Sequence, residues 1–282
     1  MNPYQKYVSG FARLFADGKS LSLGGIGAPP KTPPPPGAPV VMLFSPHPDD
    51  ECITGGLALR FMREAQMRVV NVAVTLGNNK ERRAARLAEL KNACNWIGFE
   101  LEETGLDKVS PAVRDAEPPA WNAAVKTITA LLLKHQPRAI FLPHEQDWHG
   151  THVGTHFLVM DALKMMPGDF KTTLAETEFW GQMASPNLLV ELSANDAADL
   201  IAALTHHVGE VKRNAYHLRL PAWLQDNVRR GAELVGGAGA FAPDLNFATL
   251  YRVRKWEKGG IQEAFKDGKQ IGVKDSPMLI LD

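Results

Sequence analysis

The chain of 282 residues contains only two cysteines, no excess of either charge and no long apolar run. Cys52 and Cys94 are too few for a disulfide framework, and their spacing matches no zinc motif. We therefore expect a reducing compartment, the cytoplasm. Because no run approaches the roughly 18 apolar residues of a membrane span, we expect no transmembrane segment. Residues 1–20 also lack the continuous apolar core of a secretory signal.

An excess of charge of one sign is missing as well. The 31 Lys and Arg residues balance 31 Asp and Glu residues, which gives a formal net charge of zero. Without a basic excess, no nucleic acid is expected as a partner. Hydrophobic residues make up 45% of the chain and charged residues 22%, which is typical of soluble globular proteins and excludes global disorder. The composition leaves the oligomeric state open, a homo-oligomer included.

The chain divides into three segments. Residues 29–39 contain seven prolines, a composition that favours an extended connector rather than a helix or a central strand. Residues 1–28 precede it as a helical extension, and residues 40–282 are expected to form a single domain. In the extension, apolar side chains recur at helical spacing, so we expect a helix that docks on the domain; the alternative is a helix on a membrane surface. These side chains are Tyr4, Val8, Phe11 and Phe15.

Short apolar runs alternate with amphipathic stretches after residue 39. Residues 40–44 are continuously apolar, a pattern typical of a strand buried on both faces. Strands that alternate with helices favour an α/β fold with a parallel sheet and right-handed crossovers. The expected strands are 40–44, 67–75, 99–102, 138–142, 177–180, 188–192 and 247–253, and the expected helices are 56–66, 79–97, 118–135 and 195–217, the last capped by Asn195.

Side chains that bind metals gather in two loops, each of which follows an expected strand. The first loop, 45–51, reads SPHPDDE and offers one imidazole and three carboxylates. The second loop, 144–152, holds His149 and His152, with His156 beyond it. Because the carboxyl ends of strands in open α/β sheets build ligand sites, both loops are placed where such a site forms. Adjacent carboxylates repel each other unless a cation or other partners offset their charge.

One metal ion can be held by His47, Asp50 and one histidine of the second loop. Two imidazoles, a carboxylate and an open position are typical of catalytic zinc, which lowers the pKa of bound water toward about 7. A spare carboxylate, Asp49 or Glu51, can take the proton from that water. A spare histidine can stabilise the oxyanion or protonate a leaving nitrogen. The pattern predicts metal-assisted hydrolysis, but the same ligands describe non-haem Fe(II) oxygenases, so Fe²⁺ stays open beside Zn²⁺.

Other interpretations of these residues remain. His152 and His156 are four residues apart, so on a helix they can chelate one metal, although the zincin pattern His-Glu-x-x-His is not present. The acidic residues also suit a helix N-terminus, and the histidines can be unrelated surface residues. We expect His206, His207 and His217 to be helix-surface or packing residues.

The segments SPHPDDECITGG (45–56) and DWHGTH (147–152), in this order and each after a strand, are similar to motifs of a known family. The sequence resembles the PIG-L/LmbE-like zinc-dependent N-acetylglucosaminyl deacetylases, well over roughly residues 40–165 and loosely elsewhere. The resemblance implies a Rossmann-like three-layer sandwich with a mostly parallel central sheet and a less regular C-terminal part. It also implies zinc as the cofactor and an N-acetylated amino sugar or its conjugate as the substrate.

The resemblance assigns roles to the matching residues. It implies His47, Asp50 and His152 as the zinc ligands. It implies Asp49 as the general base and His149 as the histidine that stabilises the oxyanion. Either Asp49 or His149 would deliver the proton to the leaving amine.

Substrate contacts are implied more loosely. Arg86 matches a family position associated with substrate binding. Trp148 can offer an aromatic face to a sugar ring, and Phe179 and Trp180 can do the same or pack in the core.

One position departs from the family pattern. The second motif usually reads His-Pro-Asp-His, whereas Thr151 stands here in place of the aspartate. Asp147 is the carboxylate that can substitute for it in orienting and charging His149. Without that carboxylate, His149 would have a lower pKa and stabilise an oxyanion less. The departure keeps open a protein that binds metal and sugar without turnover, besides the iron oxygenase.

Overall fold

A computed structural model describes residues 2–281, so the outer ends of the expected segments, residues 1 and 282, lie outside the described residues. The strands are β1 (Val40–Ser45), β2 (Arg68–Ala73), β3 (Glu100–Glu103), β4 (Ala139–Pro143), β5 (Thr172–Thr177), β6 (Leu188–Leu192), β7 (Phe247–Glu257), β8 (Gly260–Glu263) and β9 (Lys269–Ile271). The helices are α1 (Tyr4–Gly18), α2 (Asp50–Ile53), α3 (Gly56–Ala65), α4 (Arg83–Ile97), α5 (Pro111–Ala116), α6 (Pro118–His135), α7 (Gly150–Leu163), α8 (Ala194–Leu204), α9 (Val208–Arg213) and α10 (Tyr216–Gly236), with short 3₁₀ turns η1 (Lys80–Arg82) and η2 (Pro277–Ile280).

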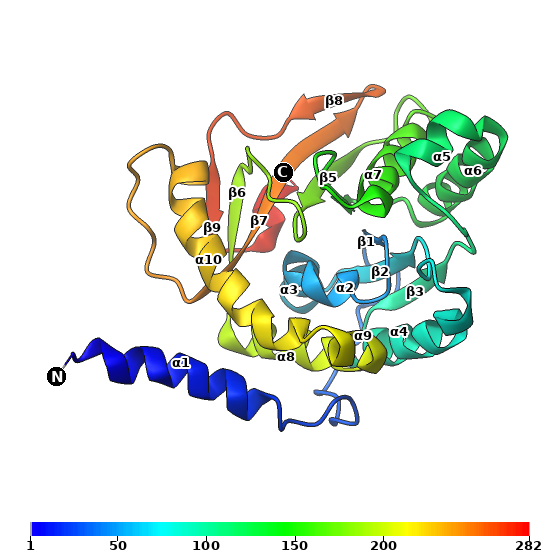
Figure 1. Cartoon of the computed structure of the whole chain (residues 1–282). Coiled ribbons are helices and arrows are strands. Elements are labelled where there is room, and N and C mark those ends of the chain that lie inside the picture. Colours follow the sequence, from blue (N-terminus) through cyan, green and yellow to red (C-terminus); the bar gives the residue numbers. More distant parts are fainter. Residues whose placement is uncertain (1, 282) are drawn as a thin grey trace.

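The strands form one sheet in the order β3-β2-β1-β4-β5-β7-β6-β9, with β8 paired to β7 (Figure 1). The first five of these strands are parallel, whereas β7 runs antiparallel to β5 and β6. Strand β9 returns to the parallel direction beside β6. The expected α/β fold with a mostly parallel sheet is therefore confirmed.

Helices cover both faces of the sheet, which is why β1 and β4 are buried along their whole length. Successive residues of a strand point to opposite faces, so Leu43 joins the core beneath α3, α4, α8 and α10, while Met42 joins the core beneath α6 and α7. Phe141 and Ile140 alternate in the same way on β4. None of the described helices has the length and hydropathy needed to cross a bilayer.

The C-terminal half differs from the sequence-based expectation in two places. The strand expected at 177–180 is wrong: β5 ends at Thr177, and its pairing with β4 begins at Thr173. The single helix expected at 195–217 is also wrong, because turns divide this region into α8, α9 and the start of α10. The cap of α8 is Ser193, whose side-chain oxygen accepts from the backbone N–H of Asp196, rather than Asn195.

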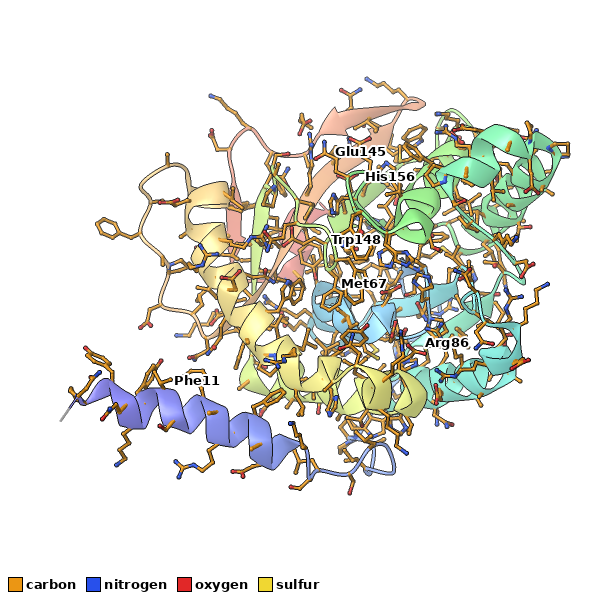
Figure 2. The ribbon with its side chains drawn as sticks, viewed as in Figure 1. Phe11, Met67, Arg86, Glu145, Trp148 and His156 are labelled. Carbon is orange, nitrogen blue, oxygen red and sulfur yellow. The ribbon has the colours of Figure 1, made fainter. Side chains whose placement is uncertain are left out.

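The N-terminal helix forms, but it does not dock along its apolar face. Helix α1 lies apart from the sheet and the helices that cover it, and Phe11 is 48% exposed (Figures 1 and 2). Tyr4 is 70% exposed and Val8 is 63% exposed. Contact with the domain is concentrated at the end of the helix, where the Arg219 guanidinium lies over the Phe15 ring. The expectation of a helix docked through its apolar residues is therefore wrong.

Candidate active site

The first loop leaves β1 at Ser45 and turns directly into α2, and its side chains are fixed by backbone hydrogen bonds. The backbone N–H of His47 donates to Asp50 Oδ2 at 2.8 Å, and that of Asp49 donates to Glu51 Oε2 at 3.0 Å. Asp49 has a φ of 116°, a left-handed conformation that costs free energy for a residue other than glycine. The two hydrogen bonds hold this turn and so fix the direction of the Asp49 carboxylate.

The second loop leaves β4, the neighbour of β1, so the two loops meet as the sequence predicts. His149 stands at the N-cap of α7 and His152 lies in its first turn. Asp147 Oδ1 accepts from the backbone N–H of His149 at 2.9 Å, and the His149 carbonyl accepts from that of His152 at 2.9 Å. The helix start therefore turns both imidazoles toward the first loop.

Three histidines converge between the loops. The ring centroids of His47, His149 and His152 lie 4.9 to 5.3 Å apart, and one nitrogen of each lies within 4.8 Å of the others. Asp50 Oδ2 is 3.5 Å from His47 Nδ1 and 3.5 Å from His152 Nε2. The structure thus brings together all three expected metal ligands, with His149 beside them.

The donor set fits zinc. His152 Nε2 is buried, has no hydrogen-bond partner among residues 2–281 and faces Asp50 across 3.5 Å. A buried imidazole nitrogen without a partner is costly unless it meets a cation or a donor, and zinc prefers imidazole and carboxylate ligands. His156 does not complete a chelating pair with His152, because its Nδ1 lies 2.9 Å from the Pro143 carbonyl oxygen and its ring is near Glu145 (Figure 2).

The two adjacent aspartates have different electrostatic surroundings. Burial raises the pKa of Asp49 well above its usual value, and the neighbouring charge of Asp50 raises it further. Burial would also raise the pKa of Asp50, but His152 and His47 lower it to about 2. Asp50 is therefore an anion at neutral pH, whereas Asp49 can exchange a proton.

His149, the N-cap residue of α7, and His152, in the first turn of that helix, differ as well. Burial lowers the pKa of His149, and the neighbouring His47 and His152 lower it further. Burial would lower the pKa of His152 too, but the carboxylates of Asp50 and Asp147 raise it. Asp147 Oδ2 lies 3.5 Å from His152 Nδ1, so this carboxylate faces the His152 ring and bonds only the backbone of His149. Asp147 therefore orients His152; its charge also raises the pKa of His149, but burial and the neighbouring histidines leave that pKa lowered.

Glu51 is part of a buried network and not a spare base. Its side chain is fully buried, and besides the Asp49 N–H it meets His207 Nε2 at 2.6 Å and the Cys52 thiol at 3.2 Å. Burial and the Glu51 charge raise the pKa of Cys52 well above its usual value, so the thiol stays protonated and donates. The three side chains are close enough to hold a metal, but Glu51 already bonds both Cys52 and His207 Nε2; His207 Nδ1 has no hydrogen-bond partner among the described residues. His207 is fully buried rather than on a helix surface, and sequence reasoning missed its link to Glu51, 156 residues away.

A cleft of about 540 Å³ opens above these residues. Arg86 is fixed at its edge, because Nη2 donates to the Pro48 carbonyl at 3.0 Å. Trp148 is 69% exposed, and its ring meets that of Trp180 edge to face at 6.2 Å. The lining residues are His47, Asp49, Asp50, Gly77, Asn78, Asn79, Arg82, Arg86, Trp148, His149, Trp180, Glu210, Arg213 and Tyr216.

Sequence reasoning did not find the part of the cleft that α9 and α10 supply. Glu210, Arg213 and Tyr216 come from this region and face residues far away in the chain. Glu210 and Arg82, which form an ion pair, are 128 residues apart. No local pattern joins residues at such a separation, so only the folded chain reveals them.

Comparison with protein families places both motifs within one match. Residues 42–163 match the model of the PIG-L family, described as GlcNAc-PI de-N-acetylase. The expected resemblance is therefore confirmed over this range. Comparison by sequence with proteins of curated function finds no match.

Solved structures share the fold at low sequence identity. The N,N'-diacetylchitobiose deacetylase of Pyrococcus horikoshii is similar over 90% of this chain and 93% of its own, with a TM-score of 0.56 and 16% identity. The zinc-inhibited form of teicoplanin deacetylase Orf2 is similar over 77% and 98%, with a TM-score of 0.54 and 12% identity. The 4-carboxy-2-hydroxymuconate hydratase of Pseudomonas putida KT2440 is similar over 76% and 95%, with a TM-score of 0.57 and 14% identity. Deacetylases and a hydratase share the fold, so the reaction must be argued from the site.

Proposed function

Because residues 42–163 match the PIG-L family model, we propose that this protein is a zinc-dependent hydrolase that removes the N-acetyl group from an N-acetylated amino sugar or its conjugate. The observation that carries the proposal is the convergence of His47, Asp50 and His152 at the floor of a cleft, with Asp49 beside them. The deacetylases among the structural neighbours support the same reaction class.

The proposed zinc ligands are His47, Asp50 and His152. Bound by these three ligands, zinc supplies a Lewis acid that lowers the pKa of water and polarises a carbonyl. Asp50 remains an anion because the two imidazoles depress its pKa, and it offsets the charge of the cation. Asp147 fixes the ring of His152 from behind, as second partners of ligand histidines do.

Asp49 is the proposed general base and then the general acid. Its carboxylate takes one proton from the attacking water, whose oxygen forms the new bond to the acyl carbon. The raised pKa of Asp49 lets the carboxyl keep this proton until the C–N bond breaks. The proton then passes to the leaving nitrogen, so acetate and a free amine are released.

His149 is proposed to stabilise the oxyanion. Its ring lines the cleft beside His47, and its Nδ1 is buried without a hydrogen-bond partner in the described part of the chain. Because the pKa of His149 is lowered, the ring is neutral at pH 7 and acts as a hydrogen-bond donor rather than as a proton source. In this proposal Asp49 delivers the proton to the leaving nitrogen.

The aromatic side chains of the cleft suit a sugar ring. Trp148 and Trp180 meet edge to face, and Tyr216 meets Trp180 at 5.3 Å between ring centroids. Faces of aromatic rings pack against the C–H face of a sugar while the sugar hydroxyls point to polar neighbours. The cleft therefore accommodates a substrate larger than the acyl group alone.

The test is acetate release by the zinc-loaded protein across N-acetylhexosamine compounds that are free, phosphorylated, glycosidically linked or lipid-linked. We expect acetate to be released from one class of compound, and we expect the Asp49→Asn variant to lose this activity. The matched control is Asp226→Asn, which removes an exposed carboxylate of α10 outside the cleft. No acetate from any class, with zinc bound, would overturn the proposal, and oxygen uptake instead would favour the iron-dependent alternative.

A further inference from the structure

Three arginines surround one carboxylate at the edge of the cleft. Glu210, on α9, is 2.8 Å from Arg82 Nη1 and 2.6 Å from Arg213 Nη2. Its Oε1 is also 3.8 Å from Arg86 Nε. The Glu210 side chain is only 5% exposed, so it serves as the inner anchor of the group. One carboxylate neutralises one of three guanidinium charges.

Two of the arginines pass close to glycine residues. A Cβ atom at Gly77 would clash with Arg86, and a Cβ atom at Gly209 would clash with Arg82. Both side chains therefore lie directly against glycine backbone, in conformations that larger residues at these positions would prevent. Glu89 lies 3.9 Å from Arg82 but does not line the cleft.

The group has donors to spare. Arg86 Nε is buried and lacks a hydrogen-bond partner among the described residues. Arg213 is 67% exposed, so most of its guanidinium is open to the cleft or solvent. A guanidinium offers paired N–H donors whose spacing matches the oxygens of a phosphate or a carboxylate. Asp49 and Asp50 also line the cleft, but around Glu210 the guanidinium groups outnumber the carboxylates, which favours a bound anion at this edge.

We propose that Arg82, Arg86 and Arg213 form a subsite for an anionic group, phosphate or carboxylate, carried by the same molecule as the acyl amide. The cleft that they line also contains Asp49 and His149, so one ligand can reach both ends. This inference rests on the proposed function for its acyl end, whereas binding of the anion is a separate property. The enzyme would then prefer acidic sugar conjugates over neutral ones.

The test is calorimetric titration of the zinc-loaded full chain in an Asp49→Asn background, where the ligand is not consumed. The probes are N-acetylglucosamine, its 1-phosphate, its 6-phosphate and N-acetylmuramic acid, so that the arms distinguish phosphate from carboxylate. The added variants are Arg213→Gln and Arg82→Gln. The matched control is Arg229→Gln, which is 72% exposed and pairs with Asp226 three residues earlier, as Arg213 pairs with Glu210. All variants keep the zinc ligands, so any direct contact of the anion with zinc cancels in the comparison.

We expect at least one acidic probe to bind about tenfold more tightly than N-acetylglucosamine. Arg213→Gln and Arg82→Gln should each reduce this preference about fivefold or more, and Arg229→Gln should leave it unchanged. A higher salt concentration should weaken the binding of the acidic probe and leave the binding of the neutral probe unchanged. Equal affinity for all probes, or a preference that both cleft variants retain, would overturn the inference. Acetate release by the native chain is measured in parallel: an acidic preference without acetate supports the subsite and contradicts the proposed function.

Discussion

Asp49 and Asp50 are neighbours in the chain, yet their carboxyls serve different purposes. Two imidazoles depress the pKa of Asp50 to about 2, while burial and the Asp50 charge raise that of Asp49. Two carboxyls whose pKa values are pushed apart suit one permanent anion and one group that exchanges a proton. Asp49 has the left-handed φ of 116° and Asp50 begins α2, and the two carboxyls meet different neighbours: Asp50 lies beside His47 and His152.

The buried pair of Glu51 and His207 should matter for stability. Replacing His207 by Ala leaves the Glu51 carboxylate buried without its closest partner, which typically costs about 3 kcal/mol or more. We expect the free energy of unfolding, measured with a chemical denaturant, to fall by about that amount. His206→Ala is the matched control and should cost less than about 1 kcal/mol, because its ring is half-exposed. Equal effects of the two variants would show that the pair contributes nothing specific.

Because His156 is buried, we expect the protein to lose stability as the pH falls. Burial lowers its pKa from the usual 6.5 to about 4, so between these values the unfolded chain binds a proton that the folded chain does not. The contribution of the neutral His156 ring to the free energy of unfolding is fully present above pH 6.5 and falls as the pH drops toward about 4. Between pH 7 and pH 5, His156→Gln should lose about 2 kcal/mol less of its unfolding free energy than the native chain. Parallel curves for the two proteins would contradict this origin.

At the scale of elements, the first half of the chain could be predicted because its signals are local. Continuous apolar runs indicate β1 and β4, and the sequence motifs lie in the loops that follow them. The C-terminal half could not be predicted in the same way. The turns that divide α8, α9 and α10 contain no proline or glycine that would mark a helix end, whereas Pro221, which usually ends a helix, lies inside α10. The site was predicted where ligands are adjacent in sequence. It was missed where long-range packing joins Glu51 to His207 and Glu210 to Arg82.

Helix α1 should contribute little to the stability of the domain. Tyr4, Val8 and Leu14 are each more than 60% exposed, so deleting residues 2–14 removes little buried apolar area. We expect the Tm to change by less than about 2 °C. Thermal unfolding and size-exclusion chromatography of the two chains provide the check. A fall of more than about 5 °C, or a smaller assembly, would mean that this apolar face is buried in solution.

At the scale of the molecule, the active-site cleft joins two halves of the chain. The family match ends at residue 163 and contains the expected zinc ligands and both candidate catalytic residues. Trp180, Glu210 and Tyr216 lie beyond it and line the same cleft. Strand β5 connects these halves because it pairs with β4 on one side and β7 on the other. The reaction is therefore expected to depend on the first half and the choice of substrate on the second.

We propose that one zinc ion, held by His47, Asp50 and His152, is required for N-deacetylation in this cleft. The most direct measurement is zinc content and acetate release on the same samples, first stripped of metal and then titrated with zinc. We expect no acetate release from the metal-free protein and a linear rise in acetate release that ends at about one zinc per chain. Asp50→Ala should fail to bind the ion and remain inactive at the same zinc concentration. Equal acetate release before and after removal of the metal, or no acetate release with one zinc bound, would contradict zinc-dependent deacetylation at this site.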